Sequence, residues 1–314
     1  MSERGTPGSI SYRRSGTMGL DIEEEATMGK AQGPVVQRRR LGRELRKLRE
    51  DAGLTIEEAG AQIQRSDSTI SRIETGARAV QIIELKGLLE AYGTPQSERD
   101  SYLRMLREAP EQGWWTEYEG TLPPGLDTYI GLESDAATLR VFALGIVHSL
   151  VQTEDYARAV IRPGRPTAST AVIDKLVSVR LERQKVLVRS PEPVQLTVVL
   201  DEGSLRRTVG GPAAMRTQVQ HLIHMAEKIP NVTLQVLPYD RGAHGAMNGG
   251  FTLIDFPDPG EPTVAYLDTP AGNLYMQKPH DTRRFDQLFG QLRGAALDAE
   301  HGSIRFLRAL LEEK

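Results

Sequence analysis

Cysteine is absent from all 314 residues of the sequence. Its absence excludes a disulfide framework, a thiolate zinc site, an iron–sulfur cluster and a cysteine nucleophile, and it suits a reducing compartment. The longest apolar run, residues 141–147, is far shorter than the roughly 18 residues that a membrane span needs. The first residues contain no apolar segment of the kind found in secretory signal peptides. We therefore expect a cytoplasmic protein with no membrane partner.

Neither sign of charge dominates the chain. The 39 lysines and arginines are offset by 42 acidic residues, for a net charge of -3. A polycation is therefore excluded, and any binding to nucleic acid must come from a local patch. With 39% apolar and 26% charged residues the composition is that of a globular protein, and 314 residues suffice for about two domains.

The distribution of residue types divides the chain into three parts. Residues 1–36 are rich in glycine, serine, threonine and arginine and show no regular period, so we expect a disordered tail. Residues 37–110 have a helical pattern throughout, whereas residues 111–314 mix helical and strand patterns. The expected fold class is therefore α + α/β.

The second part reads as five short helices, because its apolar residues recur at spacings of three and four. Gly53, Gly76 and Gly93 stand where three of these helices would end. Short helices with short connections predict a compact five-helix bundle. Its apolar positions include Leu41, Leu45, Leu48, Ile56, Ala59, Ile63, Ile70, Ile73, Ile82, Ile83, Leu85, Leu88, Leu89, Tyr102, Leu103 and Leu106.

The third part predicts a mixed α/β domain with about four strands. The glycine-rich stretch around His244 is expected to be a long hairpin connection. Strands are predicted over 195–200, 232–237, 251–255 and 264–267, and helices over 131–145, 153–161, 170–189, 212–228, 281–298 and 303–312.

Residues 54–76 have the pattern of a helix-turn-helix. Thr55 stands at the start of one short helix with Glu58 at capping-box spacing, and Ser66 stands at the start of a second. The first turn of the second helix is polar, while Ile70 and Ile73 point back into the bundle. A polar first turn on a helix held by a bundle is what reading of the major groove requires.

Over residues 40–93 the chain resembles the XRE-type, lambda-repressor-like helix-turn-helix regulators, above all in the stretch Ser-x-Ser-Thr-Ile-Ser-Arg-Ile-Glu-x-Gly. The resemblance implies double-stranded DNA as partner, a homodimer, and an ion pair between Arg49 and Glu74. Two positions depart from the usual pattern: Gln64 stands where glycine is common, and Gly60 where alanine is common. The candidate DNA-contacting residues are Thr55, Arg65, Ser66, Asp67, Ser68, Thr69, Ser71, Arg72 and Arg78.

Basic residues crowd the stretch before this motif, from Arg38 to Arg49. Beside a helix-turn-helix they suggest phosphate contacts, with Arg43 and Arg46 as the candidates, although a solvated helix face is the alternative. The role of Asp67 is open as well, because its carboxylate can read a cytosine amino group or cap the helix. A helical bundle without any DNA role is the alternative to the whole interpretation.

The third part resembles the C-terminal domain of unknown function that follows such modules in many actinobacterial regulators. The resemblance implies a regulatory context but no ligand and no reaction. The stretches that carry it include Tyr129-Ile130-Gly131-Leu132-Glu133, Leu150-Val151-Gln152-Thr153-Glu154, Val199-Leu200-Asp201-Glu202-Gly203 and Gly249-Gly250-Phe251-Thr252-Leu253. We therefore assign residues 37–110 to a helix-turn-helix DNA-binding domain and residues 111–314 to an α/β regulatory domain.

Candidate effector contacts in this domain are polar residues at strand ends and in the glycine-rich loop. Arginine suits a carboxylate or phosphate, but an internal salt-bridge network is the competing interpretation. The candidates are Arg183, Glu202, Arg206, His244 and Asn248.

Other functions for the third part stay open at this point. An enzyme using Asp201 and Glu202 as acid and base, or a domain binding a small partner protein, are the alternatives. His221, His224 and Glu227 share a helix face but form no recognised zinc motif. Because catalytic motifs are missing, we expect a regulator without enzyme activity, cofactor or metal.

Overall fold

The computed structural model describes residues 33–108, 113–118 and 120–313. Most of the predicted tail, residues 1–32, lies outside the described residues. Helix α1 begins at Pro34, which is inside the stretch assigned to the tail. A proline at the first helical position suits a helix start, because its missing N–H would have no partner there.

The N-terminal region forms the five-helix bundle that the sequence predicts. Its largest fully buried side chains include Leu45, Ile70 and Leu88, which belong to the helical stripes identified above. Burying these stripes against one another is what holds such short helices together, because helices of this length are marginal alone in water. The helices are α1 (Pro34–Asp51), α2 (Ile56–Gln62), α3 (Asp67–Glu74), α4 (Ile82–Ala91) and α5 (Gln96–Glu108).

The turn between α2 and α3 explains both departures from the usual pattern. Gln64 has a φ of 54°, and it lies where the Arg65 N–H bonds the Gly60 carbonyl at 2.9 Å, as at the end of a Schellman-type helix. A side chain at position 60 would bring its Cβ within 2.6 Å of the Arg65 carbonyl oxygen. Glycine at 60 therefore lets the chain turn back closely, while Gln64 tolerates the left-handed conformation at some cost.

The C-terminal region contains helices on both sides of one sheet. Before the sheet, the chain passes through the short 3-10 helix Trp114–Tyr118. The elements that follow are α6 (Leu126–Asp135), β1 (Thr138–Ala143), α7 (Glu154–Ile161), α8 (Thr170–Arg183), β2 (Gln195–Asp201), α9 (Glu202–Arg206), α10 (Gly211–Lys228), β3 (Val232–Leu237), β4 (Phe251–Asp255), β5 (Val264–Thr269), β6 (Gly272–Met276), α11 (Pro279–Ala295) and α12 (Gly302–Glu313).

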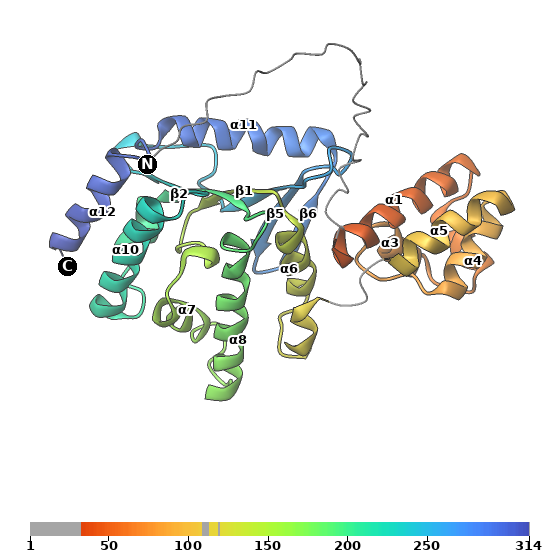
Figure 1. Cartoon of the computed structure of the whole chain (residues 1–314), viewed down its shortest axis with the longest axis horizontal. Helices are drawn as coiled ribbons and strands as arrows, with labels where there is room; N and C mark the ends of the chain where they lie inside the picture. The colour runs from red at the N-terminus through yellow and green to blue at the C-terminus, as the bar shows by residue number, and fades with distance from the viewer. Residues whose placement is uncertain (1–32, 109–112, 119, 314) are drawn as a thin grey trace, which may run out of the picture. The chain divides into compact units, whose positions relative to one another are not determined.

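The sheet has six strands in the order β3-β2-β1-β4-β5-β6. Strands β1, β2 and β3 are parallel, whereas β4, β5 and β6 run antiparallel to their neighbours. Helix α11 covers one face, and α6, α7, α8 and α10 lie on the other (Figure 1). Alternate residues of β1 point to opposite faces of the sheet. Leu139 and Val141 pack into the core on the face of α6, α7, α8 and α10, whereas Phe142 packs into the core under α11.

The fold class is confirmed, but three details of the prediction were wrong. Residues 138–143 form strand β1 instead of part of a helix over 131–145, because a strand buried on both faces is as continuously apolar as a buried helix. The edge strand β6 was not predicted either, and together with β1 it gives the sheet of the described residues six strands instead of four. The loop around His244 is no hairpin, because β2 and β1 lie between β3 and β4. No described helix is long and apolar enough to cross a membrane.

The turn at Gln64 leads to a stability prediction. Glycine adopts a positive φ without the steric penalty of a side chain, so Gln64→Gly should stabilise the bundle by about 1 kcal/mol. The measurement is hydrogen exchange of the α2 and α3 amides in the full chain. The control is Gln62→Gly inside α2, which should destabilise by about 1 kcal/mol. A loss of protection in both variants would contradict the argument.

Candidate nucleic-acid interface

Helix α3 presents a polar edge to solvent and an apolar face to the bundle. Ile70 and Ile73 are 0% and 2% exposed, and they anchor the helix. Ser66, Asp67, Ser68, Ser71 and Arg72 are exposed, and Thr69 is half-buried. Six of the nine candidate DNA-contacting residues of the motif are therefore gathered on one short helix and its cap.

Side chains at the start of α3 accept hydrogen bonds from backbone N–H groups of its first turn. Ser66 is the N-cap, as predicted, and its hydroxyl accepts the Thr69 N–H at 3.3 Å. The Asp67 carboxylate accepts the Ser68 N–H at 2.6 Å, which favours the capping role over the base-reading role for Asp67. The exposed serine hydroxyls keep hydrogen-bonding capacity that a base edge or a phosphate could use.

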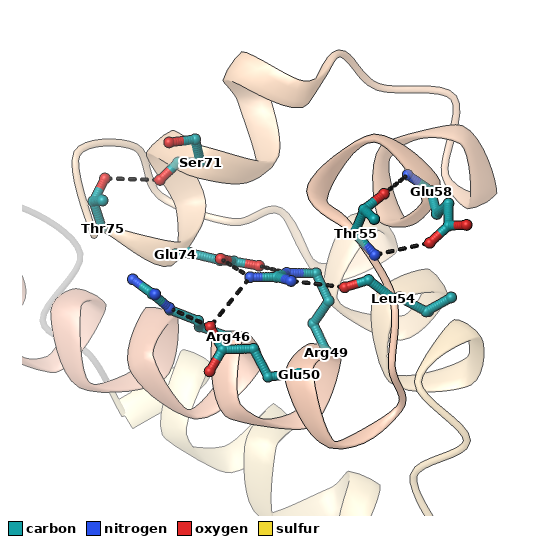
Figure 2. Close-up of polar contacts among 9 residues, drawn as sticks. All are labelled: Arg46, Arg49, Glu50, Leu54, Thr55, Glu58, Ser71, Glu74 and Thr75. Atoms are coloured by element: carbon teal, nitrogen blue, oxygen red, sulfur yellow. Dashed lines mark hydrogen bonds and ion pairs between the residues drawn. The ribbon is translucent and has the colours of Figure 1, made fainter.

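The end of α3 is tied to α1 by a buried ion pair. The Arg49 guanidinium donates to both carboxylate oxygens of Glu74, at 2.6 and 3.0 Å, and the two side chains are only 8% and 5% exposed (Figure 2). The predicted pair is therefore confirmed. Arg49 also donates to the Leu54 carbonyl at 2.7 Å, and the hydrogen bond that it donates to Glu74 raises the pKa of its guanidinium. One arginine thus connects three segments of the helix-turn-helix.

Figure 2 also shows the neighbouring contacts on the surface. Thr55 and Glu58 form the predicted capping box at the start of α2, with bonds of 3.1 and 2.8 Å. Arg46 is exposed and pairs with Glu50 one turn along α1 at 2.8 Å. Exposed pairs of this kind exchange readily with other partners, because their net contribution to stability is small.

A buried carboxylate that the sequence analysis missed holds the two loops around α3. Glu84 accepts from Arg65 at 2.7 Å and from Arg78 at 3.0 Å, and its side chain is 2% exposed. Burial alone would raise the pKa of Glu84, but these bonds and the Gln81 N–H lower it to about 2. Gln81 and Glu84 have capping-box spacing at the start of α4, a signal that could have identified this residue.

The basic residues of α1 do not form one exposed patch. Arg39 and Arg49 are buried, whereas Arg40, Arg46 and Lys47 are exposed. Arg43, predicted to contact phosphate, is half-buried, and its guanidinium donates to both oxygens of Glu261. Of the two candidates on α1, Arg46 is therefore the more accessible.

The five candidate effector residues do not converge on one cavity. Arg183 is bound to both oxygens of the buried Glu133 at 2.7 and 2.8 Å. Arg206 pairs with Glu202, whose other oxygen accepts the Tyr239 N–H at 2.7 Å. The His244 Nε2 lies 3.8 Å from the Asp201 Oδ2. Asn248, in the same loop as His244, is exposed. The salt-bridge network thus accounts for the three charged candidates.

The residues suggested for an enzyme or a metal site make structural contacts or lack partners. Asp201 caps α9 by accepting the Gly203 N–H at 2.8 Å, so it and Glu202 are both engaged in structural hydrogen bonds. The His221 Nε2 is buried without a hydrogen-bond partner. Within the described ranges, no group of three or more metal-binding side chains gathers.

This combination of a two-helix motif, an anchored second helix and a polar exposed edge defines a helix-turn-helix protein of the DNA-binding class. Comparison with protein families agrees: residues 40–102 match a helix-turn-helix domain, and residues 126–309 match the domain of unknown function DUF5753. The chain therefore belongs to the DUF5753 family, here with an N-terminal helix-turn-helix domain. No curated protein matches the chain.

The buried pair leads to a second stability prediction. Arg49→Met leaves the Glu74 carboxylate buried without its partner, so it should destabilise the bundle by about 3–5 kcal/mol. Arg46→Met removes the same charge from the same helix at an exposed pair and should cost less than about 1 kcal/mol. Hydrogen exchange of the α3 amides in the full chain measures both. Equal losses in the two variants would show that Arg49 has no special role.

The carboxylate of Glu84 leads to a prediction about pH. Its pKa is lowered from 4.5 to about 2 in the folded protein, so its stabilisation is complete above about pH 5 and is lost as the pH falls toward 2. Glu84→Gln should destabilise the bundle by about 2–3 kcal/mol at pH 7, with the difference from the wild type vanishing near pH 2. Hydrogen exchange, corrected for the intrinsic rate at each pH, measures the difference. A difference independent of pH would contradict this account.

Proposed function

We propose that the chain is a cytoplasmic, homodimeric transcriptional regulator of the XRE, lambda-repressor-like type that binds specific DNA sites. The observation that carries the proposal is the exposed polar edge of α3, on a helix whose other face is buried and whose end is fixed by Arg49 and Glu74. Such an edge can enter the major groove without deforming the bundle. A cytoplasmic location follows from the proposed partner, DNA.

Within this proposal the residues on and beside α3 have different roles, some reading bases and others contacting the DNA backbone. Arg72 is exposed, and within the described residues its guanidinium donates one hydrogen bond, to the Ser68 carbonyl at 3.3 Å, so it can turn toward a guanine edge. Ser66, Ser68 and Ser71 are short enough for close approach to bases or phosphates. Arg65 and Arg78 flank the helix with partly exposed guanidinium groups, placed for the DNA backbone by Glu84.

A homodimer is part of the proposal because one such module contacts too few base pairs for a specific site. Two copies related by a two-fold axis would read half-sites about one helical turn apart. Duplexes selected from a randomised pool by the full chain should therefore contain an inverted repeat with about 10 base pairs between half-site centres. Sites without symmetry would argue against the dimer.

The C-terminal domain is proposed to regulate DNA binding through a small effector or a partner protein, without catalysing a reaction. The engagement of Asp201 and Glu202 in capping and ion-pair contacts supports this role over acid–base chemistry. An enzyme acting on a small molecule stays the alternative.

The DNA proposal is tested with the selected duplex. Arg72→Ala and Ser68→Ala should each weaken binding by about 1–3 kcal/mol and relax the base preference at one position. Arg46→Ala should weaken binding to all sequences and reduce the salt slope by about 1. Gel-shift titrations over a salt series measure these effects. Arg216→Ala, an exposed arginine of α10, is the control and should bind normally. Unchanged binding in the first three variants would overturn the proposal.

A further inference from the structure

A cavity of about 770 Å³ opens at the carboxyl end of β1, in the C-terminal domain. Its volume falls within the range of about 300–1,000 Å³ that is typical of small-molecule sites. It lies beside the junction of β1 and β4, where the parallel half of the sheet meets the antiparallel half. Crevices outside the carboxyl ends of parallel strands are where open α/β sheets bind ligands.

Aromatic and aliphatic side chains form much of the cavity wall. Tyr129 of α6, Phe142 of β1 and Tyr266 of β5 line it, and the rings of Tyr129 and Tyr266 lie 4.1 Å apart between centroids. Leu144 and Ile146, in the loop after β1, also line it. These walls suit an apolar ligand body, because burying such surface is the main favourable contribution to binding small molecules.

Two arginines of α8 line the same cavity, and they differ in their partners. Arg183 is neutralised by Glu133, as described above, and the buried carboxylate raises the pKa of its guanidinium despite the opposing effect of burial. Among the described residues, the Arg180 guanidinium donates one hydrogen bond, at 2.9 Å, to the neutral amide oxygen of Gln152. None of their carboxylates lies within ion-pair distance of Arg180. Arg180 is therefore not part of an ion pair there, although the charges of Asp268 and Glu133 act on it from farther away.

Arg180 stays charged at the cavity, while the neighbouring imidazole of His148 stays neutral. Burial lowers the pKa of Arg180 to about 10, with a further lowering from the charge of Arg183, so the group stays protonated at neutral pH. Burial and the two arginines also lower the pKa of His148, another lining residue, to about 3, which keeps that imidazole neutral. The acid among the lining residues, Asp268, is exposed; its charge raises the pKa of Arg180 and would disfavour ligands with more than one negative charge.

The loop that carries the polar groups is held by side-chain hydrogen bonds. The Gln152 amide donates to the Val147 carbonyl at 2.6 Å, and the Gln184 amide donates to the carbonyls of Ser149 and Gln152 at 3.0 and 2.8 Å. A polar group held in this way loses little conformational freedom when a ligand binds. Arg180 and its neighbours are thus placed before any ligand arrives.

We propose that this cavity binds a small organic monocarboxylic acid, whose carboxylate pairs with Arg180 and whose apolar body lies against Tyr129, Phe142 and Tyr266. The inference deepens the effector role proposed above, and it rests on that role only for its consequence for DNA binding. A guanidinium can grip a carboxylate through two parallel hydrogen bonds, which a neutral amide of the same shape cannot match.

The test compares acids with their matched amides on the full chain by isothermal titration calorimetry. The probes are octanoate with octanamide, and 3-phenylpropionate with 3-phenylpropanamide. At least one acid should bind about tenfold or more tighter than its amide, because a hydrogen bond to a charged group is worth about 1.5–3 kcal/mol. Equal affinities within both pairs, or no binding in the millimolar range, would overturn the proposal.

Variants separate the charge from the cavity wall. Arg180→Gln should abolish the preference for the acid, whereas the surface control Arg216→Gln should keep it. Ile146→Trp, at a lining residue that is 42% exposed, should weaken acid and amide alike by about tenfold without touching the core. It also tests the site if Arg180→Gln fails to fold. An unchanged preference in Arg180→Gln, or unchanged binding in Ile146→Trp, would overturn the proposal.

Gel shifts on the same preparations distinguish the two proposals. Protein that binds its selected duplex but none of the four probes overturns the carboxylate site alone. Protein that binds an acid with the expected preference, but no DNA, supports the site and overturns the DNA-binding role.

Discussion

The buried ion pair between Arg49 and Glu74 is the constraint on which the exposed polar edge of α3 depends. Helix α3 has eight residues, too few to persist alone in water, so its position comes from packing and from its fixed end. Ile70 and Ile73 set the depth of the helix in the bundle, while the bidentate pair restricts its rotation and its register against α1. The further bond from Arg49 to the Leu54 carbonyl extends this constraint to the start of α2.

Glu84 complements that constraint on the two sides of α3. Its carboxylate gathers Arg65 before the helix and Arg78 after it, and it bonds the backbone at the start of α4. The two arginines keep 42% and 29% of their side-chain surface exposed, so they are anchored without being removed from solvent. Anchored side chains lose less entropy when they bind a phosphate, which connects a structural carboxylate to the proposed DNA contacts.

The parts of the fold that could be predicted from sequence are those decided by near neighbours. The caps at Thr55 and Ser66 and the positive φ of Gln64 depend on contacts within a few residues. The pattern predicts both caps, and it places Gln64 where related sequences commonly have glycine. Strand β1 could not be recognised in this way, because its neighbours β2 and β4 come from distant parts of the chain and bury both its faces. The effector site had the same difficulty. Arg183 was a candidate and Arg180 was not, yet both occupy one helix, and only the tertiary fold decides that Glu133 reaches Arg183.

That difference indicates how this chain separates structural arginines from those available for binding. Arg49 and Arg183 are each bound to both oxygens of a buried carboxylate, and each of these ion pairs fixes one element against another. The guanidinium groups of Arg72 and Arg180, in the described part of the chain, bond only to a carbonyl or an amide oxygen, so neither forms an ion pair with a carboxylate. Arg72 is exposed on α3, while Arg180 lines an aromatic cavity. The first location suits the edge of a base or a phosphate, and the second suits the carboxylate of a small apolar acid, because the surroundings of each guanidinium decide which anion can reach it.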